Sequence, residues 1–295
     1  MDSPSADVPR PAGPADALRG LRKKLARLSA AAAAPVSVTA GAEAASIVYR
    51  RDLPRETPHP PREDPGICIP LGRLVEGIEA PSPRGPAFYL IESPAAPHLA
   101  SALPRALDAL SPAFEAALTP EDVCFLDIET TGLGTALTFL IGTLVWRDGA
   151  LVCRQLLART YAEEASIVAA FADQARHTPL FVTFNGKTFD VPSLRARAAA
   201  TGVALAAPVF HLDLLHEARR VYKGVLPDCR LQTLERIVCC RHRVDDIAGA
   251  DIGRAYHDFV RTGDARELAL IVKHNERDLL TMAELMARML LKNET

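Results

Sequence analysis

The chain has 295 residues, of which 48% are hydrophobic and 24% charged, and 34 Lys and Arg residues against 36 Asp and Glu residues give a net charge of −2. This composition is ordinary for a globular protein, and it excludes one that binds nucleic acid through overall basic charge, although a local basic groove remains compatible with it. Aromatic residues make up only 5% of the chain, which argues against an extensive platform for stacking bases.

Residues 1–60 are expected to lie outside the folded core. The opening MDSPSADVPRPAGP has a composition typical of disorder. ADALRGLRKKLARLSA then carries Leu18, Leu21, Leu25 and Leu28 at helical spacing with basic residues between them, which predicts a basic amphipathic helix. Such a helix could contact nucleic acid or a partner, but we favour a solvated helix on a tail. The Pro-rich RDLPRETPHPPREDPG indicates an extended linker.

Residues 61–118 have a weaker pattern. AFYLIES, residues 87–93, predicts a strand, and Pro and Gly punctuate the rest. We expect a small β-containing prefix that packs on the main domain and carries no chemistry of its own.

From residue 119 to 295 the pattern is that of an α/β domain. Strands are predicted for VCFLDIE, for both halves of FLIGTLVWRDGALVCRQLLAR around the turn Arg147-Asp148-Gly149, and for LFVTFN. VFHLDLLHEARRVY predicts a short strand or loop running into a helix. Further helices are predicted for EEASIVAAFADQAR, DVPSLRARAAATG, CRLQTLERIVCC and ELALIVKHNERDLLTMAELMARML. This order predicts a mixed β-sheet flanked by helices, antiparallel at the hairpin and parallel where helices intervene.

The cysteines and apolar runs bear on the compartment. Six cysteines are present without a CxxC pair, and a group of four residues does not have the spacing of a familiar zinc site: Cys229, Cys239, Cys240 and His242. No signal peptide is recognisable, and no apolar run approaches the roughly 20 residues of a membrane helix. We therefore expect a cytoplasmic protein that does not enter a membrane.

Two carboxylates end the first strand of the main domain. Asp127 and Glu129 stand two residues apart in VCFLDIETTGLG, so on a strand both point to the same face. Like charges beside a core are costly unless a cation joins them. Either the strand ends there and water covers both groups, or the site is built for a positive ion.

Three other segments place polar groups at the ends of apolar runs. Asp190 follows a strand in FNGKTFD, His274 and Asp278 lie four residues apart within the terminal helix in HNERD, and His211 and Asp213 follow an apolar run in FHLDLL. Taken singly, Asp190 and the last pair could be helix-capping residues, and the pair in HNERD could be a solvated helix face. The acidic stretch at Asp245-Asp246 is interpreted as structural.

Together, these acids resemble a known pattern. Four carboxylates in this order are similar to those of the DEDD exonuclease superfamily, whose members have a ribonuclease-H-like fold. DIETTGL resembles its first motif and HNERD its third. FNGKTFD resembles its second motif, in the Asn-x-x-x-Phe-Asp form found in proofreading domains of family B DNA polymerases.

The resemblance is closer to one bacterial branch, the YprB-type ribonuclease-H-like family of predicted exonucleases. The motifs that carry it are, in order, DIETTGL, FLIG, VTFNGKTFD, HLDLLHEAR, CRLQTLE, DDIAG and HNERDLL. It covers roughly residues 121–290 and does not account for residues 1–60. One departure concerns His274, which is one residue closer to the last Asp than in His-type DEDD exonucleases and stands where the Tyr-type branch has tyrosine.

The resemblance implies a metal-dependent 3′→5′ exonuclease that acts on single-stranded DNA or RNA. Two divalent cations, Mg²⁺ or Mn²⁺, prefer carboxylate oxygens and together can activate water and stabilise the phosphate. Their expected ligands are Asp127, Glu129, Asp190 and Asp278, with Asp127 the best candidate to bridge both ions. His274, or a metal alone, would take the proton from the attacking water.

Contacts to the substrate are expected around the carboxylates. The loop residues Thr130, Thr131 and Gly132 would offer backbone N–H groups to a terminal nucleotide, and Asn185 would bond to its sugar or backbone. A basic rim for phosphates, or alternatively a mixed solvated surface, is formed by Lys187, Arg219, Arg220, Lys223 and Arg230.

Two alternatives stay open from the sequence. The chain could be a nuclease-like module that binds nucleic acid or protein without cleaving, or an endonuclease that uses the same site. The pattern does not choose DNA over RNA, and it identifies no protein partner.

Overall fold

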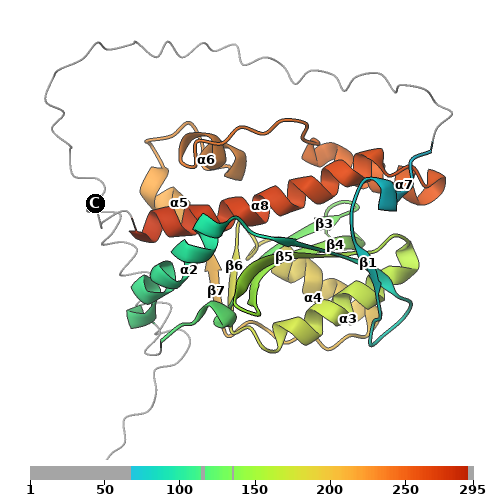
Figure 1. Cartoon of the computed structure of the whole chain (residues 1–295), viewed down its shortest axis with the longest axis horizontal. Helices are drawn as coiled ribbons and strands as arrows, with labels where there is room; N and C mark the ends of the chain where they lie inside the picture. Colours follow the sequence, from blue (N-terminus) through green and yellow to red (C-terminus); the bar gives the residue numbers. More distant parts are fainter. Residues whose placement is uncertain (1–67, 114–116, 135, 292–295) are drawn as a thin grey trace, which may run out of the picture.

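The computed structural model describes residues 68–113, 117–134 and 136–291, so the amphipathic helix and linker expected within residues 1–60 lie outside the described residues. A mixed sheet with the strand order β1-β2-β5-β4-β3-β6-β7 is covered by helices on both faces (Figure 1). Its strands are β1 (Ile78–Ala80), β2 (Phe88–Pro94), β3 (Val123–Thr130), β4 (Thr138–Arg147), β5 (Ala150–Leu157), β6 (Leu180–Thr183) and β7 (Phe210–Asp213). The expected α/β class, with helices flanking a mixed sheet, is confirmed.

The helices form two layers. The long helix α8 crosses one face of the sheet together with α2, α5, α6 and α7, while α3 and α4 cover the other face (Figure 1). Their bounds are α2 (Pro97–Leu110), α3 (Glu164–Ala175), α4 (Asp190–Thr201), α5 (Leu214–Tyr222), α6 (Leu231–Ile237), α7 (Ile252–Thr262) and α8 (Arg266–Leu291). Short 3₁₀ turns occur at Leu71–Arg73, Ser111–Ala113, Pro120–Asp122, Tyr161–Glu163 and Gly249–Asp251.

The pairing of the strands matches the expectation from their connections. β3, β4 and β5 are antiparallel neighbours, and β6 and β7 extend β3 in parallel after α3 and α4 have intervened. The β4–β5 hairpin turns at Asp148 and Gly149, whose φ angles of 51° and 80° are those of a two-residue type I′ turn. The Asp-Gly pair was the sequence signal for this hairpin.

The segment expected as a prefix contributes strands to the same sheet. β2 pairs antiparallel with β5, β1 pairs with β2, and α2 packs beside α8. The sequence analysis assigned no helix to α2 or α7. α2 has Pro97 at its start and Pro104 inside it, which weakens a helix signal. The boundaries between prefix and main domain stay a prediction.

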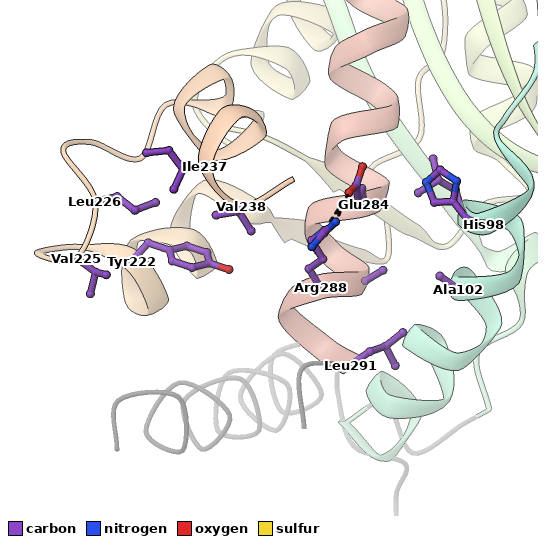
Figure 2. Close-up of a pocket in the computed structure, with 12 residues that line it drawn as sticks. His98, Ala102, Tyr222, Val225, Leu226, Ile237, Val238, Glu284, Arg288 and Leu291 are labelled. Carbon is purple, nitrogen blue, oxygen red and sulfur yellow. Dashed lines mark hydrogen bonds and ion pairs between the residues drawn. The ribbon is translucent and has the colours of Figure 1, made fainter. Parts of the chain in front are cut away.

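The outer helices leave an apolar groove at one end of the molecule. Its walls are α2, the last turns of α8 and the connection from α5 to α6, and it has a volume of about 580 Å³ (Figure 2). The groove lies away from the centre of the sheet (Figure 1).

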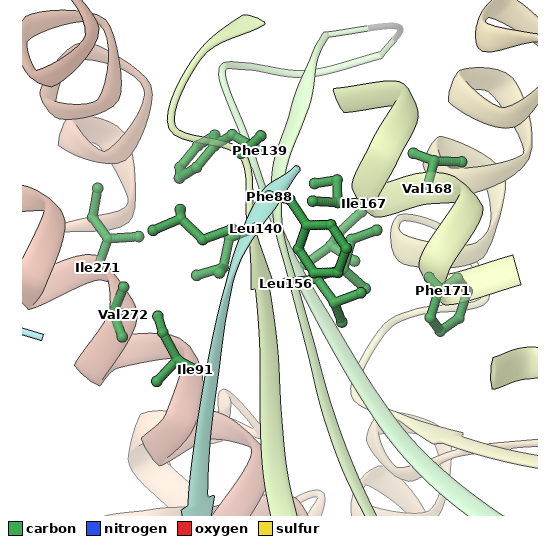
Figure 3. Packing of buried hydrophobic residues seen from close by; sticks show 14 of the residues in the cluster. Phe88, Ile91, Phe139, Leu140, Leu156, Ile167, Val168, Phe171, Ile271 and Val272 are labelled. Atoms are coloured by element: carbon green, nitrogen blue, oxygen red, sulfur yellow. The ribbon is translucent and has the colours of Figure 1, made fainter. Parts of the chain in front are cut away.

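The core fills both faces of the sheet. Figure 3 shows Ile271 and Val272 of α8 approaching one face, while Ile167 and Phe171 of α3 approach the other. Each fully buried aliphatic or aromatic side chain contributes about 1.5–3 kcal/mol relative to exposure, so the two layers hold the sheet rigidly between them. Within the described residues, no helix has the length and apolar content needed to span a bilayer.

Candidate active site

Because successive side chains of β3 point to opposite faces of the sheet, its two carboxylates both point toward α8. Cys124, which accepts from Gln174 of α3, faces one helix layer, whereas Asp127 and Glu129 face the other, where Asp127 meets Asn275 of α8. Glu129 is only 8% exposed and Asp127 is partly buried, so the pair is less open to water than it would be at an exposed strand end. Burial raises the pKa of Glu129 to about 8.

Asp190 joins this pair from the opposite helix layer. It is the first residue of α4 and only 4% exposed, and its Oδ1 accepts the backbone N–H of Ile128 at 3.1 Å. That N–H lies between the two acids of β3. The side chain is therefore more than a first-turn acid, because it ties the start of α4 to the end of β3. Burial raises the pKa of Asp190 to about 7, despite this hydrogen bond.

The terminal helix supplies the remaining groups. His274 and Asp278 lie on one face of α8, with 3.6 Å between Nε2 and Oδ2. Their side chains are 11% and 15% exposed, so they do not form a solvated helix face. The four-residue spacing thus brings both side chains to the same site.

The charges of the four carboxylates converge. Burial raises the pKa of Asp127 well above its usual range, and the negative charges of Glu129, Asp278 and Asp190 raise it further. Such mutual repulsion is relieved by protonation or by a bound cation. Across residues 68–113, 117–134 and 136–291, no three His, Cys, Asp or Glu side chains already have the arrangement of a metal site. The donor set, all carboxylate oxygens, nevertheless fits the preference of Mg²⁺ and Mn²⁺.

A buried amide network, which the sequence analysis missed, holds Asp127. Asn275 of α8 is fully buried, and its Nδ2 donates to the Asp127 carboxylate at 2.7 Å and to the Asp127 carbonyl at 3.2 Å. Gln155 of β5 donates to Oδ1 of Asn275 at 2.9 Å. Position 142, opposite Asp127 on β4, must be glycine because an added Cβ would overlap the Asn275 amide. The Asn of HNERD was the available signal, but its partners come from other strands.

A second network, also missed, surrounds His274. The imidazole Nδ1 lies 2.7 Å from the Asp246 carboxylate, whereas the sequence analysis interpreted Asp246 as a structural loop residue. Arg243 donates to Asp278, to Asp246 at 3.2 Å and to Glu235 of α6 at 2.5 Å. The loop after α6 thus places one acid against His274 and one guanidinium against Asp278.

The pKa values of this second network follow from its contacts. Burial alone would lower the pKa of His274, but the Asp246 hydrogen bond and the charges of Asp278 and Glu129 raise it to about 8. Burial would raise the pKa of Asp246, yet its bond to His274 and the nearby Arg243 bring it to about 2. The two residues therefore form an ion pair in the absence of a cation.

The loop after β6 is shaped by Asp213. Asn185 has φ 66°, and its backbone N–H and that of Lys187 donate to the Asp213 carboxylate at 2.9 and 3.1 Å. Asp213 also caps α5 by accepting from the N–H of Leu215 at 3.1 Å. The capping interpretation of Asp213 is confirmed. His211 bonds to Thr183 at 2.8 Å.

The loop after β3 is more constrained than expected. Thr130 donates its hydroxyl to the Gly132 carbonyl at 2.6 Å, and the N–H of Thr131 donates to Leu137 at 2.9 Å. The Thr131 N–H is thus engaged within the protein. Leu133, at the tip of this loop, is 87% exposed.

A pocket of about 570 Å³ opens over the site. Asp127 and Asp278 line it together with Phe184 and Asn185. Two of the five expected basic residues, Arg219 and Arg230, also line it, and both are exposed at the surface. Arg220 instead pairs with Glu217 on α5, at 2.9 Å.

Comparisons with known proteins show what this chain is similar to. A family model of the RNase_H superfamily matches residues 124–290, which include all five expected catalytic residues. "Uncharacterized protein YprB" of Bacillus subtilis (strain 168) is 33% identical over 171 residues, covering 56% of this chain and 41% of that protein. The match therefore spans less than half of the relative's length. The family B DNA polymerase from the hyperthermophilic archaeon Pyrobaculum calidifontis has a TM-score of 0.44 and 16% identity, over 56% of this chain and 24% of that chain.

Proposed function

The chain belongs to the RNase_H superfamily, and on this premise we propose that it is a metal-dependent 3′→5′ exonuclease that hydrolyses single-stranded DNA or RNA. The observation that supports the proposal is the convergence of four carboxylates: Asp127 and Glu129 from β3, Asp190 from α4 and Asp278 from α8. No single helix or strand could bring these groups together. Their mutual repulsion, which raises the pKa of Asp127, is costly unless a cation joins them, and this supports a site built to bind cations.

The four carboxylates would hold two divalent cations, Mg²⁺ or Mn²⁺. When bound, such ions activate a water molecule and stabilise the charge of the phosphate and of the leaving oxygen. Three of these carboxylates already accept a hydrogen bond. Asn275 donates to Asp127, the N–H of Ile128 donates to Asp190, and Arg243 donates to Asp278. These donors orient the carboxylates before any ion binds.

His274 is the proposed general base. A proton on Nδ1, donated to Asp246, leaves Nε2 as the acceptor, and Nε2 is the atom nearest Asp278. The pKa of about 8 reflects the hydrogen bond to Asp246 together with the charges of Asp278 and Glu129, which no bound cation yet balances. Neutralising those acids would lower this pKa and return the imidazole to the form that accepts a proton.

The pocket suits the end of a single strand. Its volume of about 570 Å³ lies within the range of small-ligand sites. Arg219 and Arg230 would contact phosphates, the ring of Phe184 would meet a base, and Asn185 would bond to sugar or phosphate. Thr130, Gly132 and Lys187 stay proposed substrate contacts, whereas the Thr131 N–H already donates to the Leu137 carbonyl and would not meet a nucleotide.

The test is hydrolysis of 5′-labelled single-stranded oligonucleotides, DNA and RNA in parallel, with Mn²⁺ or Mg²⁺ and with chelator. We expect a metal-dependent ladder that shortens from the 3′ end and is lost in Asp127→Asn. Asp173→Asn, which changes an exposed acid of α3, is the matched control and should cleave normally.

Two other outcomes would replace this proposal. Cleavage of a circular single strand, which has no end, would show an endonuclease acting at the same site. Retained binding with no cleavage of either polymer, under any metal, would identify a non-catalytic module.

A further inference from the structure

The apolar groove beside the terminal helix has no role in the proposed chemistry. Figure 2 shows Val225, Leu226 and Val238 on one side of it, Ala102 of α2 on the other, and Leu291 of α8 between them. Large apolar side chains at its rim face solvent, since Val225 is 73% exposed and Ile237 is 40% exposed. Exposed apolar surface that is concentrated in a groove is typical of a docking site.

The groove is separate from the carboxylates. On α8 its lining begins at Glu284, about 9 Å along the helix axis beyond Asp278. Glu284 itself is paired with Arg241 and Arg288, so its charge is balanced, and the other polar side chains of the lining are His98 and Tyr222. What remains for an occupant is an apolar channel that is open along one side.

We propose that residues 16–29 of the same chain dock in this groove as an amphipathic helix. These residues lie outside the described part of the structure, and the inference uses their sequence alone. Leu18, Leu21, Leu25 and Leu28 recur at intervals of three and four, so a helix would present all of them on one stripe, with its basic residues elsewhere. A stripe of this kind binds apolar grooves through anchors spaced i, i+3, i+7.

The position of the first described residues supports an intramolecular contact. Cys68 lies 3.5 Å from the carbonyl of Thr262, and the N–H of Ala265 donates to Ile69, so the chain joins the fold at the start of α8. The groove surrounds the other end of α8, about 33 Å away along its axis at Arg288. The two ends of α8 lie at opposite sides of the molecule in Figure 1.

The length of the tether matches this span. Residues 29–67 connect the last leucine to the described fold. A fully flexible coil of this length would have a root-mean-square span of about 34 Å, the Pro-rich stretch RDLPRETPHPPREDPG within it favours a somewhat longer span, and the segment can extend to roughly 130 Å. The effective concentration of a tethered segment at its binding site is highest when the average length of the tether matches the distance to be spanned, and it can then reach the millimolar range. This advantage favours the chain's own segment over a second copy or a separate protein.

The experiment is photocrosslinking in the full-length chain. A photoreactive phenylalanine analogue replaces Leu25, on the leucine stripe, or Lys23, which a helix would present on the opposite face. Mixing isotopically light and heavy protein separates crosslinks within one chain from those between chains. We expect Leu25 to crosslink to α2, α8 or the α5–α6 connection within one chain, about tenfold more than Lys23.

A groove variant tests the same contact from the other side. Val225→Glu places a charge in the groove at an exposed position, and Val209→Glu places one at a comparably exposed valine outside it, at 53% exposure. Both variants should keep the thermal midpoint of the wild type. Val225→Glu should reduce the Leu25 crosslink about tenfold, and Val209→Glu should leave it unchanged. Crosslinks between chains, crosslinks elsewhere, or equal yields from both probes or both variants would overturn the proposal.

Discussion

The Asn275 side chain donates a 2.7 Å hydrogen bond to the Asp127 carboxylate, and it reaches that position only because Gly142 leaves space for it. Three neighbouring strands meet at this point, because Asp127 pairs with Gly142 on β4 and Gly142 pairs with Gln155 on β5. The amide of Gln155 completes the arrangement by donating to Asn275. The orientation of the central carboxylate thus depends on residues that would not touch the substrate.

Gly142→Ala should therefore disable the site without altering any residue expected to touch the substrate. The added methyl would displace the Asn275 amide, and we expect the free energy of unfolding to fall by about 1–3 kcal/mol. Hydrolysis of the oligonucleotide should fall at least tenfold while the chain still folds. Gly72→Ala is the control, because nothing lies within 4 Å of a Cβ at that position. Full activity in folded Gly142→Ala would contradict a positioning role for Asn275.

Asp246→Asn should change the titration of His274. The Asp246 hydrogen bond raises the pKa of His274, so its loss should lower that pKa from about 8 toward the ordinary histidine value. The imidazole ring signals of metal-free protein, followed by NMR across the pH range, measure this directly. Hydrolysis should also fall in this variant, because an amide at position 246 no longer fixes the tautomer of the His274 imidazole as the carboxylate does.

Asp245→Asn is the matched control for this titration. Asp245 precedes Asp246 in the chain and is exposed, so its substitution should leave the His274 titration and the cleavage rate unchanged. If Asp246→Asn gave the same titration curve as the wild type, the bond to His274 would not be the cause of the raised pKa.

The metal-free protein should lose stability as the pH rises from about 5 to 8. Burial raises the folded-state pKa of Asp190 to about 7 and of Glu129 to about 8, so the folded state keeps protons that the unfolded chain has released. Each excess proton lowers the free energy of unfolding by about 1.4 kcal/mol per pH unit over this window. Chemical denaturation in chelator at pH 5.5, 7 and 8 measures the trend.

The same experiment has two internal checks. Added Mn²⁺ should restore stability at pH 8 by replacing the protons, and it should do little at pH 5.5. Asp127→Asn removes one of the repelling charges, so the variant should be more stable than wild type at pH 8 in chelator. Stability that is flat or rises over this range would argue against a cluster of mutually repelling carboxylates.

The sequence predicted the parts of the site that depend on local periodicity. The two-residue period of a strand placed Asp127 and Glu129 on one face, and the helical period placed His274 beside Asp278. Asn275 stood within the same motif, but its role depends on Gly142 of β4, which is far from it in the sequence. α7 was not predicted, although its buried residues Ile252, Ala255, Tyr256 and Phe259 have helical spacing.

Arg243 and Asp246 could not have been predicted in this way. They lie in the segment between α6 and α7, outside any regular helix or strand, and no period relates them to α8. Their contact with Asp278 and His274 exists only after the segment has folded against the terminal helix. Long-range pairing of this kind leaves no spacing pattern in a single sequence, whereas the carboxylates left one because they sit on regular elements.

Two arginines with similar partners provide the last prediction. Arg243 contacts Glu235, Asp246 and Asp278 with a side chain that is 9% exposed. Arg254 likewise pairs with three acids, Asp258 and Glu267 among them, but its side chain is 45% exposed. Removing one partner of a buried ion network leaves uncompensated charge and costs about 3–5 kcal/mol, whereas an exposed pair contributes about 0–1 kcal/mol.

Arg243→Gln should therefore destabilise the metal-free protein by several kcal/mol, and Arg254→Gln by less than about 1 kcal/mol. Mn²⁺ should increase the stability of Arg243→Gln more than that of the wild type, because the ion would replace the positive charge that the substitution removes from beside Asp278. Denaturation of both variants with and without the ion gives the comparison. Equal losses in the two variants would mean that Arg243 does not balance the buried acids, and the carboxylates would then need another source of positive charge before an ion binds.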